Sequence, residues 1–241
     1  DTVSRADGGA FGGAVSMAST LAVTGASTLS STLDVTGTTT IGNGTSGVAK
    51  INGGSSSSGQ LIFMDAGTNR ARIGVPTGTT TLSLSGSNTL TGDVVITADG
   101  EVTMPTQPAF MAKPASNQDD IATGSNVTVV LGTEVFDIGS NFASNIFTAP
   151  VTGKYLFVFT LYGSQLDGDS SYFEIAIVTT NRGYAVINEP SGSEDVYAGG
   201  TVSVVADMDA NDTAFARVAI GSGATTFDIT TSSTFSGALI C

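Results

Sequence analysis

The chain has 241 residues, of which 31 are glycine, and its formal net charge is −13 with only eight lysines and arginines. So few basic side chains cannot neutralise a phosphate backbone or an anionic lipid surface, which excludes nucleic-acid binding and disfavours membrane association. The chain has no histidine and one cysteine, Cys241, which excludes a Ser-His-Asp triad, a His/Cys zinc site and an internal disulfide. No apolar run approaches the ~20 residues of a membrane helix, so no membrane insertion is expected.

Aromatic side chains divide the chain near residue 105. Residues 1–107 contain two, Phe11 and Phe63, whereas the other fifteen phenylalanines and tyrosines lie in residues 108–241. Because an independent core needs large apolar side chains, only the second part is expected to form a globular domain of its own. We therefore predict three regions: residues 1–18 as an anchor or a continuation of a shaft, residues 19–104 as a stalk, and residues 108–241 as a head.

A twelve-residue repeat runs through the predicted stalk. Each unit has two apolar residues spaced by two, a glycine and a further aliphatic residue, which is the pattern of a short strand with one apolar face followed by a turn. There are three copies and a weaker fourth that lacks the glycine: Leu21, Val23, Gly25 and Leu29; Leu33, Val35, Gly37 and Ile41; Leu82, Leu84, Gly86 and Leu90; and Val94, Ile96 and Val102.

A single unit of this repeat is too small to be stable alone. Its three aliphatic side chains contribute about 1.5–3 kcal/mol each on burial, and ordering its residues costs about 1.5 kcal/mol per residue. The units are therefore expected to stack on each other and on identical chains, as a slender homotrimeric β stalk. The alternative is a disordered Gly/Ser/Thr linker, which has no reason to keep Leu and Val in phase.

The stretch between the second and third copies predicts a hairpin inserted in the stalk near residues 59–75. Residues 60–65 and 70–75 are typical of two strands, and residues 66–69, "AGTN", are typical of the turn between them. Arg70 and Arg72 supply half of the basic charge of residues 1–107. We interpret them as a solvated face, with an anion site as the alternative.

Residues 108–241 are typical of an all-β domain. Segments rich in Val, Ile, Phe and Tyr alternate with turns rich in Gly, Asn, Asp and Ser, and helical signal is nearly absent. The segments predicted as strands are residues 126–132, 154–162, 172–180, 184–189 and 199–208. The predicted fold is therefore all-β, with a repetitive trimeric β stalk followed by a jelly-roll sandwich head.

One spaced pattern in the head resembles the C1q/tumour-necrosis-factor-like domain. In that family a phenylalanine precedes a Gly-x-Tyr-x-Phe-x-aromatic strand, and Phe147, Gly153, Tyr155, Phe157 and Phe159 match it. The physical pattern agrees, because three aromatic residues spaced by two share one face of a strand. The resemblance implies a ten-stranded jelly roll that assembles as a homotrimer.

The resemblance extends over residues 108–241. Residues 133–142 are similar to the strand and turn that precede the motif, Asn211-Asp212 stands where the family usually has Gly-Asp, and the last strand is similar around Phe235 and Gly237. The distance from Phe142 to Phe147 is two residues shorter than in the family, so the loop between them is expected to differ.

A C1q-like head on a "TLxVTG" stalk also resembles bacteriophage tail and virion fibres. The resemblance implies a trimeric structural protein on the virion surface, extracellular, with its N-terminal region on a tail or capsid protein and its head on a host-surface glycan or protein. One alternative is a capsid-decorating or cell-surface fibre whose head only trimerises and caps the stalk. Another is a glycan hydrolase spike, which the lack of tryptophan disfavours, so no enzyme activity is expected.

Two polar segments of the head supply candidate receptor-binding residues, because function on a rigid sandwich tends to lie on exposed loops. Residues 164–171 contribute Asp167 and Asp169, and residues 189–200 contribute Glu194, Asp195 and Tyr197, whose ring is suited to stacking on a sugar. The head carries four basic and fourteen acidic side chains. Direct salt bridges to an anionic glycan are therefore disfavoured, and a bridging divalent cation or uncharged contacts are expected.

A second acidic cluster comprises Asp207, Asp209 and Asp212. It begins like a calcium loop but lacks the glycine and the final glutamate of an EF-hand, which excludes that motif. A looser surface Ca²⁺ site is the alternative to an ordinary turn, and no other cofactor is expected.

Overall fold

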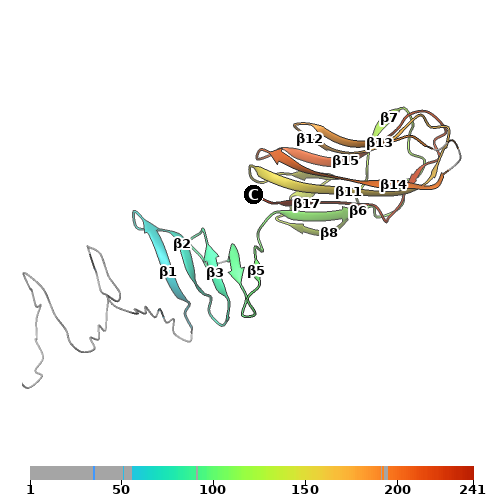
Figure 1. Cartoon of the computed structure of the whole chain (residues 1–241). Coiled ribbons are helices and arrows are strands. Elements are labelled where there is room, and N and C mark those ends of the chain that lie inside the picture. Colours follow the sequence, from blue (N-terminus) through green and yellow to red (C-terminus); the bar gives the residue numbers. More distant parts are fainter. Residues whose placement is uncertain (1–34, 36–50, 52–55, 91, 191, 193–194) are drawn as a thin grey trace, which may run out of the picture. The chain divides into compact units, whose positions relative to one another are not determined.

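The computed structural model describes residues 35, 51, 56–90, 92–190, 192 and 195–241. The chain divides into two compact units, residues 1–50 and residues 51–241. The predicted anchor and the first two copies of the repeat lie outside the described residues, apart from Val35. Every regular element in the described part is a β-strand (Figure 1), and that part contains no helix able to cross a membrane.

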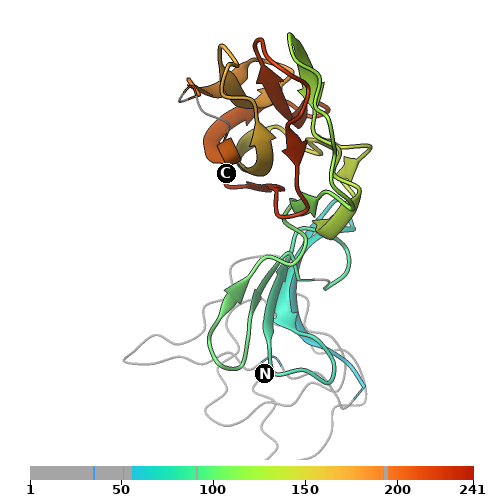
Figure 2. The ribbon, with the colours of Figure 1, turned by 90° about the vertical axis from the view of Figure 1, so that its right-hand side faces the viewer.

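The described part of the predicted stalk is one antiparallel meander, in the order β1-β2-β3-β4-β5 (Figure 1), and the sheet is twisted (Figure 2). Ala66 and Gly67 join the first two strands with φ of 46° and 78°, as in a type I′ turn. The two strands form a hairpin over residues 59–75, and its two-residue turn is tighter than the expected turn over residues 66–69. The strands are β1 (Gly59–Asp65), β2 (Thr68–Val75), β3 (Leu82–Ser85), β4 (Val94–Ile96) and β5 (Val102–Thr103).

The third and fourth copies of the repeat are neighbouring strands of this meander. Leu82 lies opposite Ile96, and Leu84 lies opposite Val94. Directly opposed residues share a face of an antiparallel sheet, so the two copies place their aliphatic side chains together. Leu90, the last apolar position of the third copy, lies in the loop between β3 and β4.

The head consists of two antiparallel six-stranded sheets that form a jelly-roll-like sandwich (Figure 1). The first sheet has the order β14-β11-β17-β6-β8, with β16 paired to β11. Its strands are β6 (Ala109–Lys113), β8 (Thr133–Ile138), β11 (Gly153–Leu166), β14 (Asp195–Met208), β16 (Asp228–Ile229) and β17 (Thr234–Leu239). The second has the order β13-β12-β15-β10-β9, with β7 paired to β15, and its strands are β7 (Ser125–Thr128), β9 (Phe142–Ala143), β10 (Ile146–Thr148), β12 (Phe173–Thr179), β13 (Gly183–Asn188) and β15 (Thr213–Ile220).

Aromatic rings fill the space between the two sheets. Tyr155, Phe157 and Phe159 alternate along β11 and are fully buried, as are Phe147 and Phe235. Burial raises the pKa of Tyr155, whose hydroxyl donates to the Val151 carbonyl at 2.8 Å. Each buried ring contributes on the order of 2–3 kcal/mol, so the residues that carry the family resemblance are also those that hold the sandwich together.

The short distance between Phe142 and Phe147 is a tight turn. Ser144 and Asn145 have φ of 52° and 68°, so they form a two-residue turn with left-handed backbone at both positions. The turn places Phe142 directly opposite Phe147, and both rings stack on Phe110 with centroid separations of 4.8 and 4.9 Å. The missing residues therefore shorten the turn and leave the core intact.

The outward face of β11 and β14 is uncharged over most of its length. Leu156 lies opposite Val205 and Tyr162 lies opposite Gly199, with hydroxyl-bearing pairs between them. Leu156, Tyr162 and Val205 are 39%, 43% and 55% exposed. Exposed apolar patches rimmed by polar residues mark interaction sites on soluble proteins. We call the surface formed by Leu156, Val158, Tyr162 and Val205 the head face.

Candidate functional site

Tyr197 lies on a strand rather than in a loop, which corrects the expectation for residues 189–200. The strand β14 begins at Asp195, and Tyr197 pairs with Ser164 of β11. Gly199, in the segment predicted as a strand over residues 199–208, allows close packing there, because a Cβ on it would lie 2.3 Å from the Leu161 carbonyl oxygen. Glu194 lies outside the described residues, so only Asp195 and Tyr197 of this candidate group are placed by the structure.

Tyr197 borders an open depression of about 250 Å³. Its ring is 64% exposed and lies 5.6 Å, centroid to centroid, from the ring of Tyr162. An exposed ring beside an amide and a carboxylate offers a stacking surface together with hydrogen-bond donors and acceptors. The depression is lined by Leu166, Phe173, Asn188, Glu189, Pro190, Tyr197, Ala198 and Gly199.

Sequence reasoning missed Tyr162, Asn188 and Glu189 in this group. The signal for Tyr162 is its phase, because the buried aromatic residues of β11 occupy odd positions and an even position therefore faces outward. No comparable signal exists for Asn188 and Glu189, which approach Tyr197 through the packing of β13 beside the start of β14.

Asp167 connects two loops through hydrogen bonds to its carboxylate. Its carboxylate accepts hydrogen bonds from the amide of Ala224 at 2.5 Å and from the amide of Asp169 at 3.0 Å. These bonds, the one from Ala224 foremost, hold the pKa of Asp167 below its usual value. Gly223 beside it has φ of 105°, and a Cβ there would lie 2.7 Å from the Asp167 carboxylate. Both oxygens of Asp167 are therefore engaged, whereas Asp169 is exposed.

We expect the hydrogen bonds to the Asp167 carboxylate to weaken in acid. A carboxyl whose pKa is lower in the folded chain stabilises the fold above its unfolded pKa of about 3.9, and this contribution disappears as the pH falls through the lower folded value. The protection factor of the Ala224 amide, which is the intrinsic exchange rate at each pH divided by the observed rate, should fall below about pH 4, and Asp167→Asn should lower it at neutral pH. Asp169→Asn is the control and should leave the Ala224 amide protected. An Ala224 amide that stays equally protected in Asp167→Asn would contradict this role.

The acidic cluster at residues 207–212 is a turn closed by its own hydrogen bonds. Asp212 Oδ2 accepts from the amide of Asp209 at 2.9 Å and from Asn181 Nδ2 at 3.0 Å. Asn211 has φ of 75°, a left-handed conformation that asparagine tolerates better than most residues. This conformation explains why asparagine can stand where the C1q family usually has glycine.

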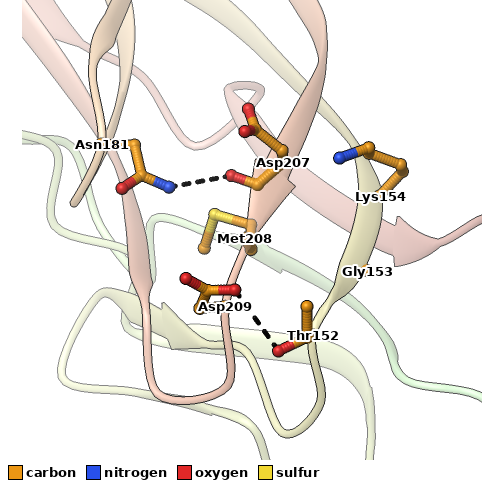
Figure 3. Close-up of a pocket in the computed structure, with 7 residues that line it drawn as sticks. All are labelled: Thr152, Gly153, Lys154, Asn181, Asp207, Met208 and Asp209. Carbon is orange, nitrogen blue, oxygen red and sulfur yellow. Dashed lines mark hydrogen bonds between the residues drawn. The ribbon is translucent and has the colours of Figure 1, made fainter.

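The three carboxylates of this turn have separate partners. Asp207 Oδ1 lies 3.6 Å from the Arg182 guanidinium, whereas Asp209 Oδ1 accepts from Thr152 Oγ1 at 3.5 Å. Figure 3 shows the side chains of Asp207 and Asp209 pointing in different directions, at the edge of a depression of about 130 Å³ that Lys154 also borders. Within the described residues no three carboxylate or thiol groups gather closely enough to hold a metal ion. The Ca²⁺ site stays a prediction, and hydrogen bonds to Asp212 close the turn in the structure.

The head is thus a sandwich of two sheets around an aromatic core, with polar depressions beside Tyr197 and beside Asp207. The C1q domain family model matches residues 109–240, which is more than half of the chain. The chain therefore belongs to the C1q domain family, whose domains are binding or structural domains.

Among solved structures the chain is similar to the globular domain of a zebrafish complement 1qA protein, with 18% identity and a TM-score of 0.44, covering 56% of this chain and 98% of that one. It is also similar to murine APRIL in crystals at pH 8.5 and pH 5.0, with 12% and 13% identity and a TM-score of 0.40, covering 56% of this chain and 99% of those. No curated protein matches the sequence.

Proposed function

We propose that the chain is a homotrimeric structural fibre protein of a virion, and that its C1q-type head attaches to a host-surface glycan or protein. The observation that carries the proposal is the combination of a C1q domain at residues 109–240 with an upstream apolar repeat too thin to form a core in one chain. Domains of this family form homotrimers and are typically extracellular. The uncharged head face supports an assembly of the same kind in this chain.

The attachment site that we favour is the depression beside Tyr197. It offers an exposed ring, the Asn188 amide and the Glu189 carboxylate within one hollow, which is the set of groups that binds a neutral or weakly charged glycan. Fourteen acidic side chains in the head disfavour a strongly anionic ligand without a bridging cation.

Adsorption of the labelled full chain to bacterial cells and to a glycan array tests this function. We expect Tyr197→Ala to weaken binding about ten-fold, because loss of a central aromatic contact costs on the order of 1.4 kcal/mol or more. Ile187→Ala is the matched control, since Ile187 is 61% exposed on the other sheet, and it should bind normally. A chelator arm separates cation bridging from direct contact. Strong adsorption that is unchanged in Tyr197→Ala would exclude this site.

One observation favours a second function: acidic side chains that were candidates for binding accept hydrogen bonds within the head instead. Because Asp167 and Asp212 hold turns together, the head offers fewer free ligands than the sequence suggests. In this alternative the head only trimerises and caps the stalk of a capsid-decorating or cell-surface fibre. Absence of adsorption by a folded, trimeric chain would favour it.

A further inference from the structure

One face of the β1–β5 sheet is apolar across all five strands. Leu61 lies opposite Ile73, Ile73 opposite Leu84 and Leu84 opposite Val94, while Leu82, Ile96 and Val102 form a parallel row. We call this surface the stalk face. Its large side chains are Leu61, Phe63, Ile73, Val75, Leu82, Leu84, Val94, Ile96 and Val102.

The opposite face of the same sheet carries hydrogen-bonded polar side chains together with two aliphatic ones, Ile62 opposite Arg72 and Val95 opposite Ser83. Arg72 donates to Gln60 Oε1 at 2.8 Å, and Ser85 Oγ accepts from the amide of Gly92 at 2.7 Å. Ser83 and Ser85 are buried there although they are polar. Most polar groups of this opposite face have partners within the sheet, although Arg72 Nε has none. The stalk face is the more apolar of the two surfaces, as in antiparallel sheets that pack a single face.

The stalk face leaves a large apolar area in contact with water. Six of its side chains are at least 36% exposed, from Ile73 at 36% to Val102 at 64%. With roughly 200 Å² per fully exposed side chain the patch amounts to about 600 Å², the upper end for a lone soluble protein and close to the ~800 Å² that each partner buries in a stable interface.

The edges of the sheet are poorly suited to strand addition. The pairing of the edge strand β1 with β2 shifts register between Phe63 and Met64, where Arg70 of β2 is the extra residue, and the hairpin carries the Asp65–Arg70 ion pair at 3.4 Å. The other edge, β5, has only two residues, Val102 and Thr103. Bulges, charges and short strands block edge pairing, so association through this sheet uses its face.

We propose that the stalk face packs against the same face of two identical chains, so that three sheets enclose one apolar interior. None of the side chains that form the stalk face is charged. The same uncharged face of an identical chain is therefore a suitable partner. Residues 104–108 connect the sheet to a domain whose family forms homotrimers, and such a short tether raises the effective concentration of the other two sheets to the mM range. This inference rests on the homotrimer of the proposed function.

Two isoleucines provide a matched test. Ile73 on the stalk face and Ile62 on the opposite face are both 36% exposed in the single chain, and neighbouring strands pair them with Leu61 and Arg72. Each is changed to cysteine in the full chain after the exposed Cys241 has been replaced by serine. The readouts are particle mass, the rate of maleimide labelling and cross-linking by a short bis-maleimide.

In a trimer we expect Ile73→Cys to label on the order of ten-fold more slowly than Ile62→Cys, because its thiol reacts only when the interface opens. Ile73→Cys should also cross-link between chains, and Ile62→Cys should not. A trimer in which both cysteines label equally fast, with no cross-linking from position 73, overturns this inference and leaves the proposed function standing. A monomeric full chain overturns both.

Discussion

Gly237→Val should strongly destabilise the head and lower its unfolding midpoint. A Cβ at this position would lie 2.5 Å from Phe157 Cδ1 and 2.8 Å from Phe110 Cε1, and both rings are at most 1% exposed. Overpacking a close-packed core costs about 1–3 kcal/mol, occasionally more, and valine, with two methyl groups beyond its Cβ, should lie at the upper end in a domain stabilised by about 5–15 kcal/mol. Urea or thermal unfolding of the full chain, followed by near-ultraviolet circular dichroism of the tyrosines, measures the effect.

The control for this change is Gly183→Val in β13. No atom lies within 4 Å of a Cβ built on Gly183, so valine should fit and leave the unfolding midpoint almost unchanged. Gly237→Ala should be intermediate, with a loss of about 1–3 kcal/mol. Equal midpoints for Gly237→Val and the wild-type chain would mean that the packing around Phe157 is looser than the structure has it.

Val205→Asp should dissociate the proposed trimer of heads. Val205 is 55% exposed on the uncharged head face, opposite Leu156. Burying three unpaired carboxylates in an apolar interface costs several kcal/mol per charge, which is more than one interface residue contributes. Light scattering should report three times 24.1 kDa for the wild-type chain and a smaller particle for the variant.

Ile187→Asp is the matched change on the other sheet. Ile187 is 61% exposed on the edge strand β13, so the added charge stays in water. Its repulsion from Glu174 on the neighbouring strand is a cost within each chain, and the trimer should persist. If Val205→Asp remains a trimer, the head face is not an interface between chains, whatever the state of the stalk face.

The sequence predicted those parts of the fold that depend on short-range alternation. The aromatic residues of β11 alternate with polar and aliphatic ones, and this pattern alone identifies a strand with one core face. Residues 59–75 likewise predict their hairpin, since Ala66 and Gly67 follow one β-rich segment and precede another. Both predictions concern neighbours in the chain.

The site could be predicted less well, because it depends on contacts between distant segments. The carboxylate of Asp167 is engaged by Ala224, which no local pattern around residue 167 indicates. The predicted strand over residues 199–208 begins too late, because β14 starts at Asp195 and pairs with β11 over its whole length. Composition therefore favoured a loop at Tyr197, and only the pairing of β11 with β14 places its ring on a rigid strand.

The strand order has a consequence for the timing of biosynthesis. In the β1–β5 meander every strand pairs only with its neighbours in sequence, so its hydrogen bonds can form as soon as residue 103 has left the ribosome. In the head, β17 lies between β11 and β6. The hydrogen bonds that join β6 and β11 through β17 therefore cannot form until residues 234–239 have been synthesised. Such non-local pairing is slow and leaves apolar surface open meanwhile. We therefore expect the insertion of β17 to be the last step before chains can associate through their heads.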